Sequence, residues 1–266
     1  MTAILGGGKG QLLTCRKNED SVLGHGKEFS NLTTTPTIVK GLLSNKTVDG
    51  LAIGAGFMVC STKENLTYSW GDGFWGAFGH QNTEHCHEPT CIVGLMGQYI
   101  KKIACGSNHT VVLTKEYNKN HVFVFGCNTD GQLGIKTEDS IMSTPTRLIC
   151  PGILDVSCGY ENSFFLGKSD ILGCGKFVDQ DQVDRKVLVV PKPRIIITFK
   201  PETIYEITAA ASKQLYALGV RSIKSDEVQD HAHIHDFNGL EEKCAYFTSE
   251  ISTKLLLPMK HLPMLT

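Results

Sequence analysis

The chain repeats itself at intervals of about fifty residues, and this period limits the fold more than any other feature. Three marks carry the repeat: an apolar run ending in a small residue and glycine, an aromatic residue followed by glycine, and a later proline. The first mark falls at Gly7, Gly54, Gly106, Gly159 and, with alanine replacing glycine, Ala210, in steps of 47, 52, 53 and 51 residues. The second falls at Gly24 (with leucine for the aromatic residue), Gly71, Gly126 and Gly173 (again after a leucine), and the third at Pro36, Pro89, Pro145 and Pro191. A unit that cannot bury its own apolar face is expected to stack against its neighbours.

Each unit consists of short β-rich runs joined by glycine-rich turns. In the best-preserved unit, Thr110 to Leu113 and Val122 to Phe125 flank a polar turn, as in a β-hairpin. The sequence therefore predicts an all-β protein, a single β-propeller domain over 1–266 with about five recognisable blades in an incomplete or open ring. The approximate blades are 1–47, 48–98, 99–152, 153–202 and 203–266. In the last blade, Leu255 to Leu257 belong either to a further copy or to a cover over the barrel end.

Composition excludes several classes of function. A net charge of -1 and a pI near 6.8 leave no basic field to hold nucleic acid as the main ligand. Ten cysteines in 266 residues are too few for a disulfide scaffold. No run reaches the length of a membrane-spanning helix, so the sequence predicts a cytoplasmic or nuclear protein without a membrane span.

The best-preserved unit also carries a family resemblance. Its two segments, 103–114 (IACGSNHTVVLT) and 124–134 (VFGCNTDGQLG), resemble the repeat of the regulator of chromosome condensation family. The resemblance is clear over 48–198 and weaker over 1–47 and 199–220. It implies a propeller that usually has seven blades, whereas about five units fit this chain.

The resemblance also implies a candidate activity, nucleotide exchange on the small GTPase Ran. That activity uses acidic and histidine side chains just after the first mark, where this chain places Asn108, His109 and Glu161. Glu161 is the sole acid at these positions, and His109 is favoured as a structural residue within the blade. The prediction is therefore a non-enzymatic module that binds a protein partner, with exchange on a small GTPase such as Ran as the alternative.

Two clusters have side chains that zinc prefers. The first contains His80, His85, Cys86, His87 and Cys91, and the second contains His231, His233 and His235. The spacing of the first cluster matches no known zinc finger, and a solvated loop is the favoured interpretation. In the second cluster the alternation would place three histidines on one face of a strand, either as zinc ligands or, as we favour, on a solvent-facing edge strand. We therefore expect no metal and no cofactor.

The aromatic pair in the turn 72–76 is the candidate protein-binding site. When the units are aligned, Phe74 and Trp75 take positions that the next unit fills with Thr129 and Asp130, while Phe78 matches a core leucine. Together with Asp72 they form either an exposed binding surface or a pair of rings folded over the neighbouring blade.

Overall fold

The structure, a computed structural model, describes residues 2–6, 10–18, 21–29, 32–178, 187–198, 206–209, 215–219 and 255–258. Within these ranges the chain is all-β apart from turns and two short 3-10 segments, η2 (Gly41–Leu43) and η3 (Val93–Leu95). The predicted fold class is confirmed.

The strands form five antiparallel sheets, each a simple meander in chain order. The first sheet contains β1 (Thr2–Gly6), β2 (Gln11–Lys17) and β3 (Leu32–Ile38). The second contains β4 (Val48–Ile53), β5 (Phe57–Thr62), β6 (Thr67–Gly71) and β7 (Cys86–Cys91). The third contains β8 (Tyr99–Cys105), β9 (His109–Glu116), β10 (Lys119–Cys127) and β11 (Ile141–Leu148). The fourth contains β12 (Asp155–Cys158), β13 (Asn162–Leu166), β14 (Asp170–Val178) and β15 (Val187–Thr198), and the fifth β16 (Glu206–Ala209), β17 (Leu215–Gly219) and β18 (Leu255–Pro258).

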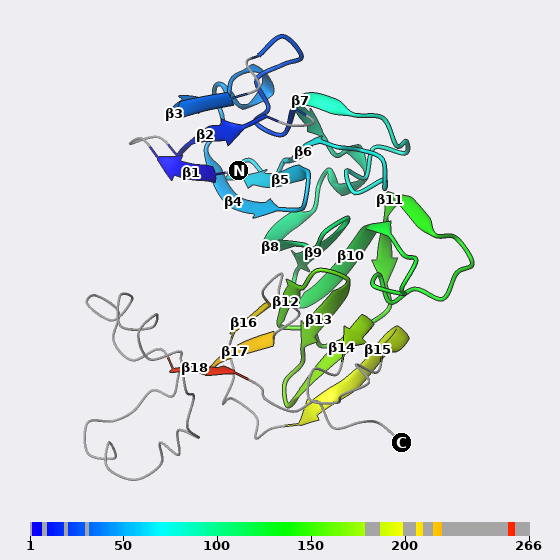
Figure 1. Cartoon of the computed structure of the whole chain (residues 1–266). Coiled ribbons are helices and arrows are strands. Elements are labelled where there is room, and N and C mark those ends of the chain that lie inside the picture. The colour runs from blue at the N-terminus through cyan, green and yellow to red at the C-terminus, as the bar shows by residue number, and fades with distance from the viewer. Residues whose placement is uncertain are drawn as a thin grey trace, which may run out of the picture.

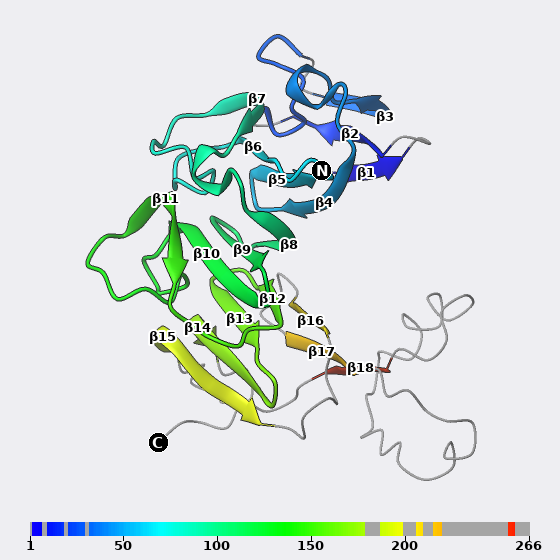
Figure 2. The ribbon, with the colours of Figure 1, turned by 180° about the vertical axis from the view of Figure 1, so that it is seen from behind.

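The sheets follow one another along an arc, with the first sheet at one end and the fifth at the other (Figures 1 and 2). On the inner side of the arc, β8 packs against both β4 and β12, and β12 packs against β16. The strands β3, β7 and β11 lie on the outer side. β18 pairs with β17 as the third strand of the fifth sheet, so Leu255 to Leu257 belong to that sheet.

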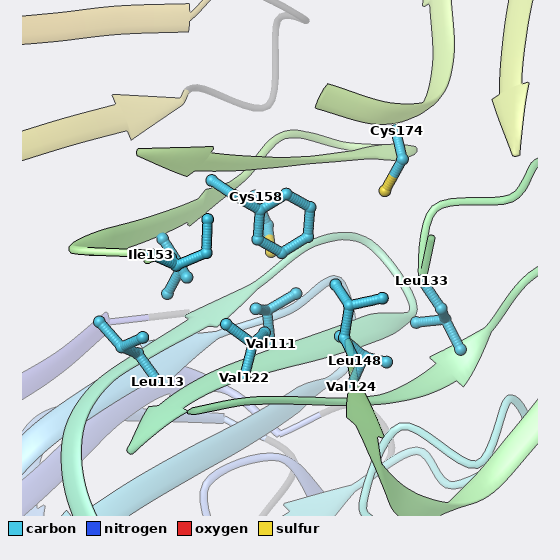
Figure 3. Close-up of a cluster of buried hydrophobic side chains, with 11 residues drawn as sticks. Val111, Leu113, Val122, Val124, Leu133, Leu148, Ile153, Cys158 and Cys174 are labelled. Atoms are coloured by element: carbon cyan, nitrogen blue, oxygen red, sulfur yellow. The ribbon is translucent and has the colours of Figure 1, made fainter. Parts of the chain in front are cut away.

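Side chains of adjacent sheets interdigitate to form the core. Between the third and fourth sheets, Val111, Leu113, Val124 and Leu133 meet Phe165 and other apolar residues in one buried cluster (Figure 3). The apolar residues Ile103, Val111, Leu113 and Val124 of the best-preserved unit are all buried.

The glycine of the second mark lies at a bulge where the third strand of a sheet turns outward. Gly71, Gly126 and Gly175 have φ angles of 113°, 111° and 101°, a region that favours glycine. A Cβ on any of them would lie within 2.5 Å of a backbone oxygen of the preceding turn. The equivalent residue in the fourth sheet is therefore Gly175, and the prediction of Gly173 was wrong by two residues.

The proline mark belongs to the outermost strand of each sheet and packs on the sheet before it. A Cβ on Gly79 would lie 3.0 Å from Pro145, and one on Gly134 would lie 2.9 Å from Pro193. Pro193 is thus the equivalent of Pro145, and the prediction of Pro191 was also two residues early. Because side chains alternate with a period of two, a slip of two residues keeps every side chain on its face and leaves the hydrophobic pattern unchanged.

The first unit was assigned out of phase. Thr14 donates to the carbonyl oxygen of Leu23 at 2.8 Å, as Ser69 does to that of Phe78 at 2.9 Å. β2 is therefore the equivalent of β6, so β1 corresponds to β5 and is not the opening strand that the first mark predicted. Gly24 likewise matches Gly79 instead of Gly71. Among the described residues, the first sheet has no innermost strand.

Candidate functional site

The turn after β6 holds Phe74 and Trp75 on a fixed backbone. The amide of Phe74 donates to Asp72 Oδ1 at 2.9 Å, and the amide of Gly76 donates to the carbonyl oxygen of Gly73 at 2.8 Å. Gly73 has no room for a side chain, because a Cβ would lie 1.9 Å from the carbonyl oxygen of Glu84. The backbone of this turn is therefore closely constrained by its own bonds and by its neighbour.

The two rings lie partly in solvent. Phe74 is 59% exposed, Trp75 is half-buried, and their ring centroids lie 5.2 Å apart in an edge-to-face arrangement of 85°. Phe78, four residues after Phe74, is fully buried in the contact between the second and third sheets. Phe74 is thus the exposed member of the pair, and Trp75 supports its ring.

Backbone hydrogen bonds join this turn to the turns of the next two sheets. The amide of Asp72 donates to Gly56, the amide of Ala55 donates to Ser107, and the amide of Ser107 donates to Tyr160, all at 2.8–2.9 Å. The candidate aromatic pair and the candidate exchange residues, predicted as separate sites, therefore lie along one continuous surface. We call it the ridge and define it by Ala55, Asp72, Phe74, Trp75, Asn108, Asp130, Tyr160, Glu161 and Lys176.

An ion-pair group occupies the far end of the ridge. Lys176 Nζ lies 3.2 Å from Glu161 Oε2 and 3.9 Å from Asp130 Oδ1. The hydrogen bond and charge of Glu161, with the charge of Asp130, raise the pKa of Lys176. Sequence reasoning missed Lys176, although it follows Gly175 as Asp72 follows Gly71, because the repeat had been placed two residues too early there.

His109 lies inside the fold and does not reach the ridge surface. Its side chain is completely buried, and its Nε2 lies 3.0 Å from the hydroxyl of Ser163 in the fourth sheet. That hydroxyl donates to the carbonyl oxygen of Gln132 at 2.7 Å. His109 thus links the third and fourth sheets through its side chain, and its Nδ1 has no hydrogen-bond partner among the described residues. The backbone of Asn108 accepts the amide of Cys127 and holds the turn of the third sheet.

Burial makes His109 sensitive to acid. It lowers the pKa of His109 to about 4, from an ordinary value of 6.5. Between these two values His109 is protonated in the unfolded chain but neutral in the folded chain. The free energy of unfolding is therefore expected to fall by about 3 kcal/mol between pH 6.5 and 4. Urea unfolding across this range should show a shallower loss for His109→Gln than for the parent. The exposed His85→Gln is the control and should keep the full loss, whereas parallel pH profiles for His109→Gln and the parent would contradict the assignment.

The histidines of the first metal cluster have other partners. His80 Nε2 lies 2.9 Å from the Ser69 hydroxyl, His87 Nδ1 lies 2.7 Å from the Ser21 hydroxyl, and His85 Nδ1 lies 3.5 Å from Asp72. In the part of the chain that the structure describes, no group of three or more histidine, cysteine or acidic side chains is arranged to hold a metal ion. His231, His233 and His235 lie outside the described residues.

Buried thiols behave as apolar groups here. Burial raises the pKa of Cys86 and Cys91, and raises the pKa of Cys158 to about 12. A thiol with a raised pKa stays protonated at neutral pH, which disfavours both metal binding and nucleophilic attack. Cys158 therefore serves as a small hydrophobic residue in the cluster between the third and fourth sheets.

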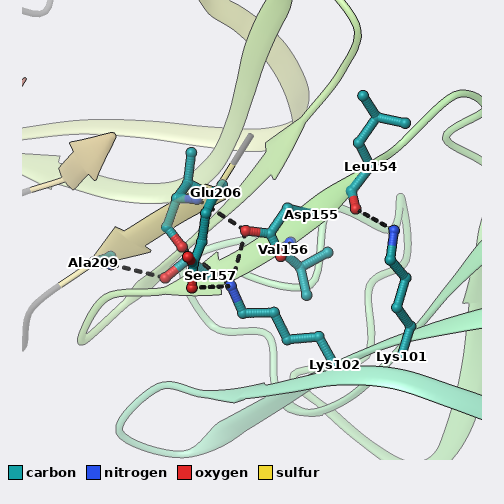
Figure 4. A network of polar contacts seen from close by, with 9 residues as sticks. Lys101, Lys102, Leu154, Asp155, Val156, Ser157, Glu206 and Ala209 are labelled. Carbon is teal, nitrogen blue, oxygen red and sulfur yellow. Dashed lines mark hydrogen bonds and ion pairs between the residues drawn. The ribbon is translucent and has the colours of Figure 1, made fainter. Parts of the chain in front are cut away.

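The inner side of the arc contains a hollow of about 230 Å³, lined by residues of β4, β8, β12 and β16. At its edge Lys102 Nζ donates to Asp155 Oδ2 at 2.8 Å and to the carbonyl oxygen of Ile207 at 3.2 Å (Figure 4). Asp155 also accepts the amide of Ile207 at 2.8 Å. These bonds link the third, fourth and fifth sheets. Lys102 and Asp155 at the edge of the hollow are therefore already hydrogen-bonded within the protein.

Known proteins share these repeats. The family model described as "Regulator of chromosome condensation (RCC1) repeat" matches residues 64–113 and 119–166, and a second model of that repeat matches 100–132. Over 253 residues the chain is 36% identical to the ultraviolet-B receptor UVR8 of Arabidopsis thaliana, covering 89% of this chain and 55% of the receptor. Over 159 residues it is 33% identical to the mouse serine/threonine-protein kinase Nek9, covering 58% of this chain and 15% of the kinase.

A solved propeller gives the same result for the fold. The crystal structure of Prp20p from Saccharomyces cerevisiae superposes with a TM-score of 0.60 and 25% identity, covering 79% of this chain and 54% of that chain. Residues 64–166 therefore carry repeats of the regulator of chromosome condensation family, as the sequence resemblance predicted. It spans about half the length of UVR8 and of Prp20p.

Proposed function

We propose that this chain is a non-enzymatic module that binds a protein partner through the ridge. The observation that carries the proposal is the exposed ring of Phe74, supported edge-to-face by Trp75 on a turn with a fixed backbone. Aromatic side chains that are held rigidly lose little entropy on binding and are enriched among residues that dominate interface energies.

The charges beside the rings indicate what kind of partner fits. Asp72, Asp130 and Glu161 lie along the ridge with the single cation Lys176 among the ridge residues. A partner surface with an apolar pocket for Phe74 and basic side chains around it would match both features. The acidic groups would set orientation and association rate, and the rings would supply most of the affinity.

Replacing Trp75 with alanine is expected to abolish partner capture. Loss of a central aromatic group costs an interface about 2 kcal/mol or more, which weakens binding roughly thirtyfold. Pulldown from lysate with mass spectrometry would compare the parent, Trp75→Ala and Phe74→Ala, with Leu42→Ala, an exposed apolar side chain outside the ridge, as the matched control. The melting temperature of Trp75→Ala should stay within a few degrees of the parent. If Trp75→Ala unfolds, or if capture persists in both ridge variants, the ridge is not the binding surface.

Nucleotide exchange on a small GTPase such as Ran is the alternative function. Prp20p, which shares this fold, is described as binding Gsp1p and histones. In this chain, however, Glu161 is paired with Lys176 and His109 is completely buried. The activity is tested by adding the purified chain to small GTPases loaded with labelled GDP. Accelerated release from any of them would support exchange, and unchanged release across the panel would remove it.

A further inference from the structure

The ends of the third sheet that point away from the ridge carry unusually exposed apolar side chains. Ile149, which follows β11, is 94% exposed, and Tyr117 in the turn between β9 and β10 is 91% exposed. Tyr99 at the start of β8 is 58% exposed and pairs with Lys115 of β9. These three side chains therefore come from three neighbouring strand ends.

The backbone geometry of its turn does not explain why a tyrosine stands at position 117. Its φ is 52°, and it occupies the first position of the two-residue turn between the paired residues Glu116 and Lys119. A positive φ at that position favours glycine, and a bulky residue is rare there. The chain thus places a large ring at the tip of the hairpin against the local backbone preference.

Basic side chains surround these apolar groups. Lys101, Lys115, Lys119 and Arg147 are all exposed at the same strand ends. Lys101 Nζ donates to the carbonyl oxygen of Leu154 at 2.9 Å, which places its charge beside the start of the fourth sheet (Figure 4). The acid at this end, Glu116, lies 3.1 Å from His121 Nε2. We call the set of Tyr99, Lys101, Lys115, Tyr117, Lys119, Arg147 and Ile149 the hairpin-end patch.

We propose that the hairpin-end patch binds the surface of an anionic membrane. Charge complementarity favours an anionic surface, since the described residues at this end of the third sheet include four exposed cations and one acid, Glu116. The apolar groups project from strand tips, and they line neither the hollow on the inner side of the arc nor a second hollow beside His25 and Phe29. A protruding tyrosine and isoleucine flanked by lysines suit the headgroup region of a bilayer, where the ring lies at the interface and the cations meet lipid phosphates.

This assignment is compatible with the rest of the fold. No helix among the described residues is long and apolar enough to cross a membrane. The ridge lies at the opposite ends of the same strands, because β9 runs from His109 on the ridge side to Glu116 at the patch. A protein partner on the ridge and a membrane at the patch can therefore be bound at the same time.

Sedimentation with lipid vesicles tests the proposal on the full chain. We expect binding to phosphatidylcholine vesicles that contain about 30% phosphatidylserine, and loss of binding when salt is raised from about 0.1 M to about 0.5 M. Each lysine removed should weaken binding about fivefold, so Lys115→Gln/Lys119→Gln should weaken it roughly twenty-five-fold. Tyr117→Ser should also weaken it, because the apolar contact with the interface is lost.

The control variant is Lys27→Gln/Lys136→Gln, which makes the same change in net charge at exposed sites outside the patch. It should bind vesicles like the parent. Equal weakening in both double variants, or no binding of the parent beyond that to pure phosphatidylcholine, would overturn the proposal. If the parent does not bind vesicles but binds immobilised polyglutamate through Lys115 and Lys119, the patch binds an acidic protein and the membrane assignment is wrong.

Discussion

Replacing Trp70 with alanine is expected to lower the free energy of unfolding by about 3–5 kcal/mol, as for other large aromatic residues removed from a packed core. The Trp70 side chain is completely buried between the first and second sheets. Its Nε1 donates to the carbonyl oxygen of Val22 at 2.9 Å, and its ring fills the space beside Gly24. The substitution would leave a cavity and an unpaired backbone oxygen at the contact that holds the first sheet.

The second tryptophan provides a matched control. Trp75 is half-buried at the surface, so Trp75→Ala should cost less than about 1 kcal/mol in the same urea-unfolding experiment. Far-ultraviolet circular dichroism should show that Trp70→Ala retains β structure in the remaining sheets. Equal losses for the two variants would mean that the first sheet does not depend on Trp70.

The repeat accounts for the difference between the two tryptophans, although the sequence alone made no prediction for Trp70 and left the exposure of Trp75 open. Trp70 precedes the bulge glycine, as the buried Phe125 does, whereas Trp75 matches Asp130. The alignment was correct for the second and third units because both keep the glycine at the bulge. In the first unit Arg16 stands at that position, and the phase was therefore taken from Gly24, which belongs to the later turn.

The sequence located parts of the ridge but not their relation to one another. Phe74 and Glu161 were found by comparing units, since each differs from its equivalents. Their common surface results from hydrogen bonds between turns of different sheets, such as Ser107 to Tyr160, and one sequence contains no signal for these bonds. The ion pair of Lys176 with Glu161 could not be predicted, because the repeat glycine of the fourth unit was taken as Gly173 instead of Gly175.

Replacing Asp155 with alanine is the second change with a large expected effect, about 3 kcal/mol of stability. The carboxylate is 9% exposed and accepts hydrogen bonds from Lys102 Nζ and from the amides of Val156 and Ile207. Its removal leaves the ammonium group of Lys102 with the more distant carboxylate of Glu206, at 4.0 Å, and the amide of Ile207 without its acceptor. Because that amide belongs to β16, the fifth sheet should loosen first.

Hydrogen exchange would distinguish this local effect from general destabilisation. The amide of Ile207 should lose protection in Asp155→Ala more than the amides of β9, which lie in the neighbouring third sheet. In a double-mutant cycle with Lys102→Met, the double variant should lose less stability than the sum of the two single-variant losses, by about 1 kcal/mol. Asp130→Ala, which removes a carboxylate 3.9 Å from Lys176 at the surface, should cost about 0.5 kcal/mol or less. Additive losses, or unchanged protection at Ile207, would show that Lys102 and Asp155 do not hold the fifth sheet to the third and fourth.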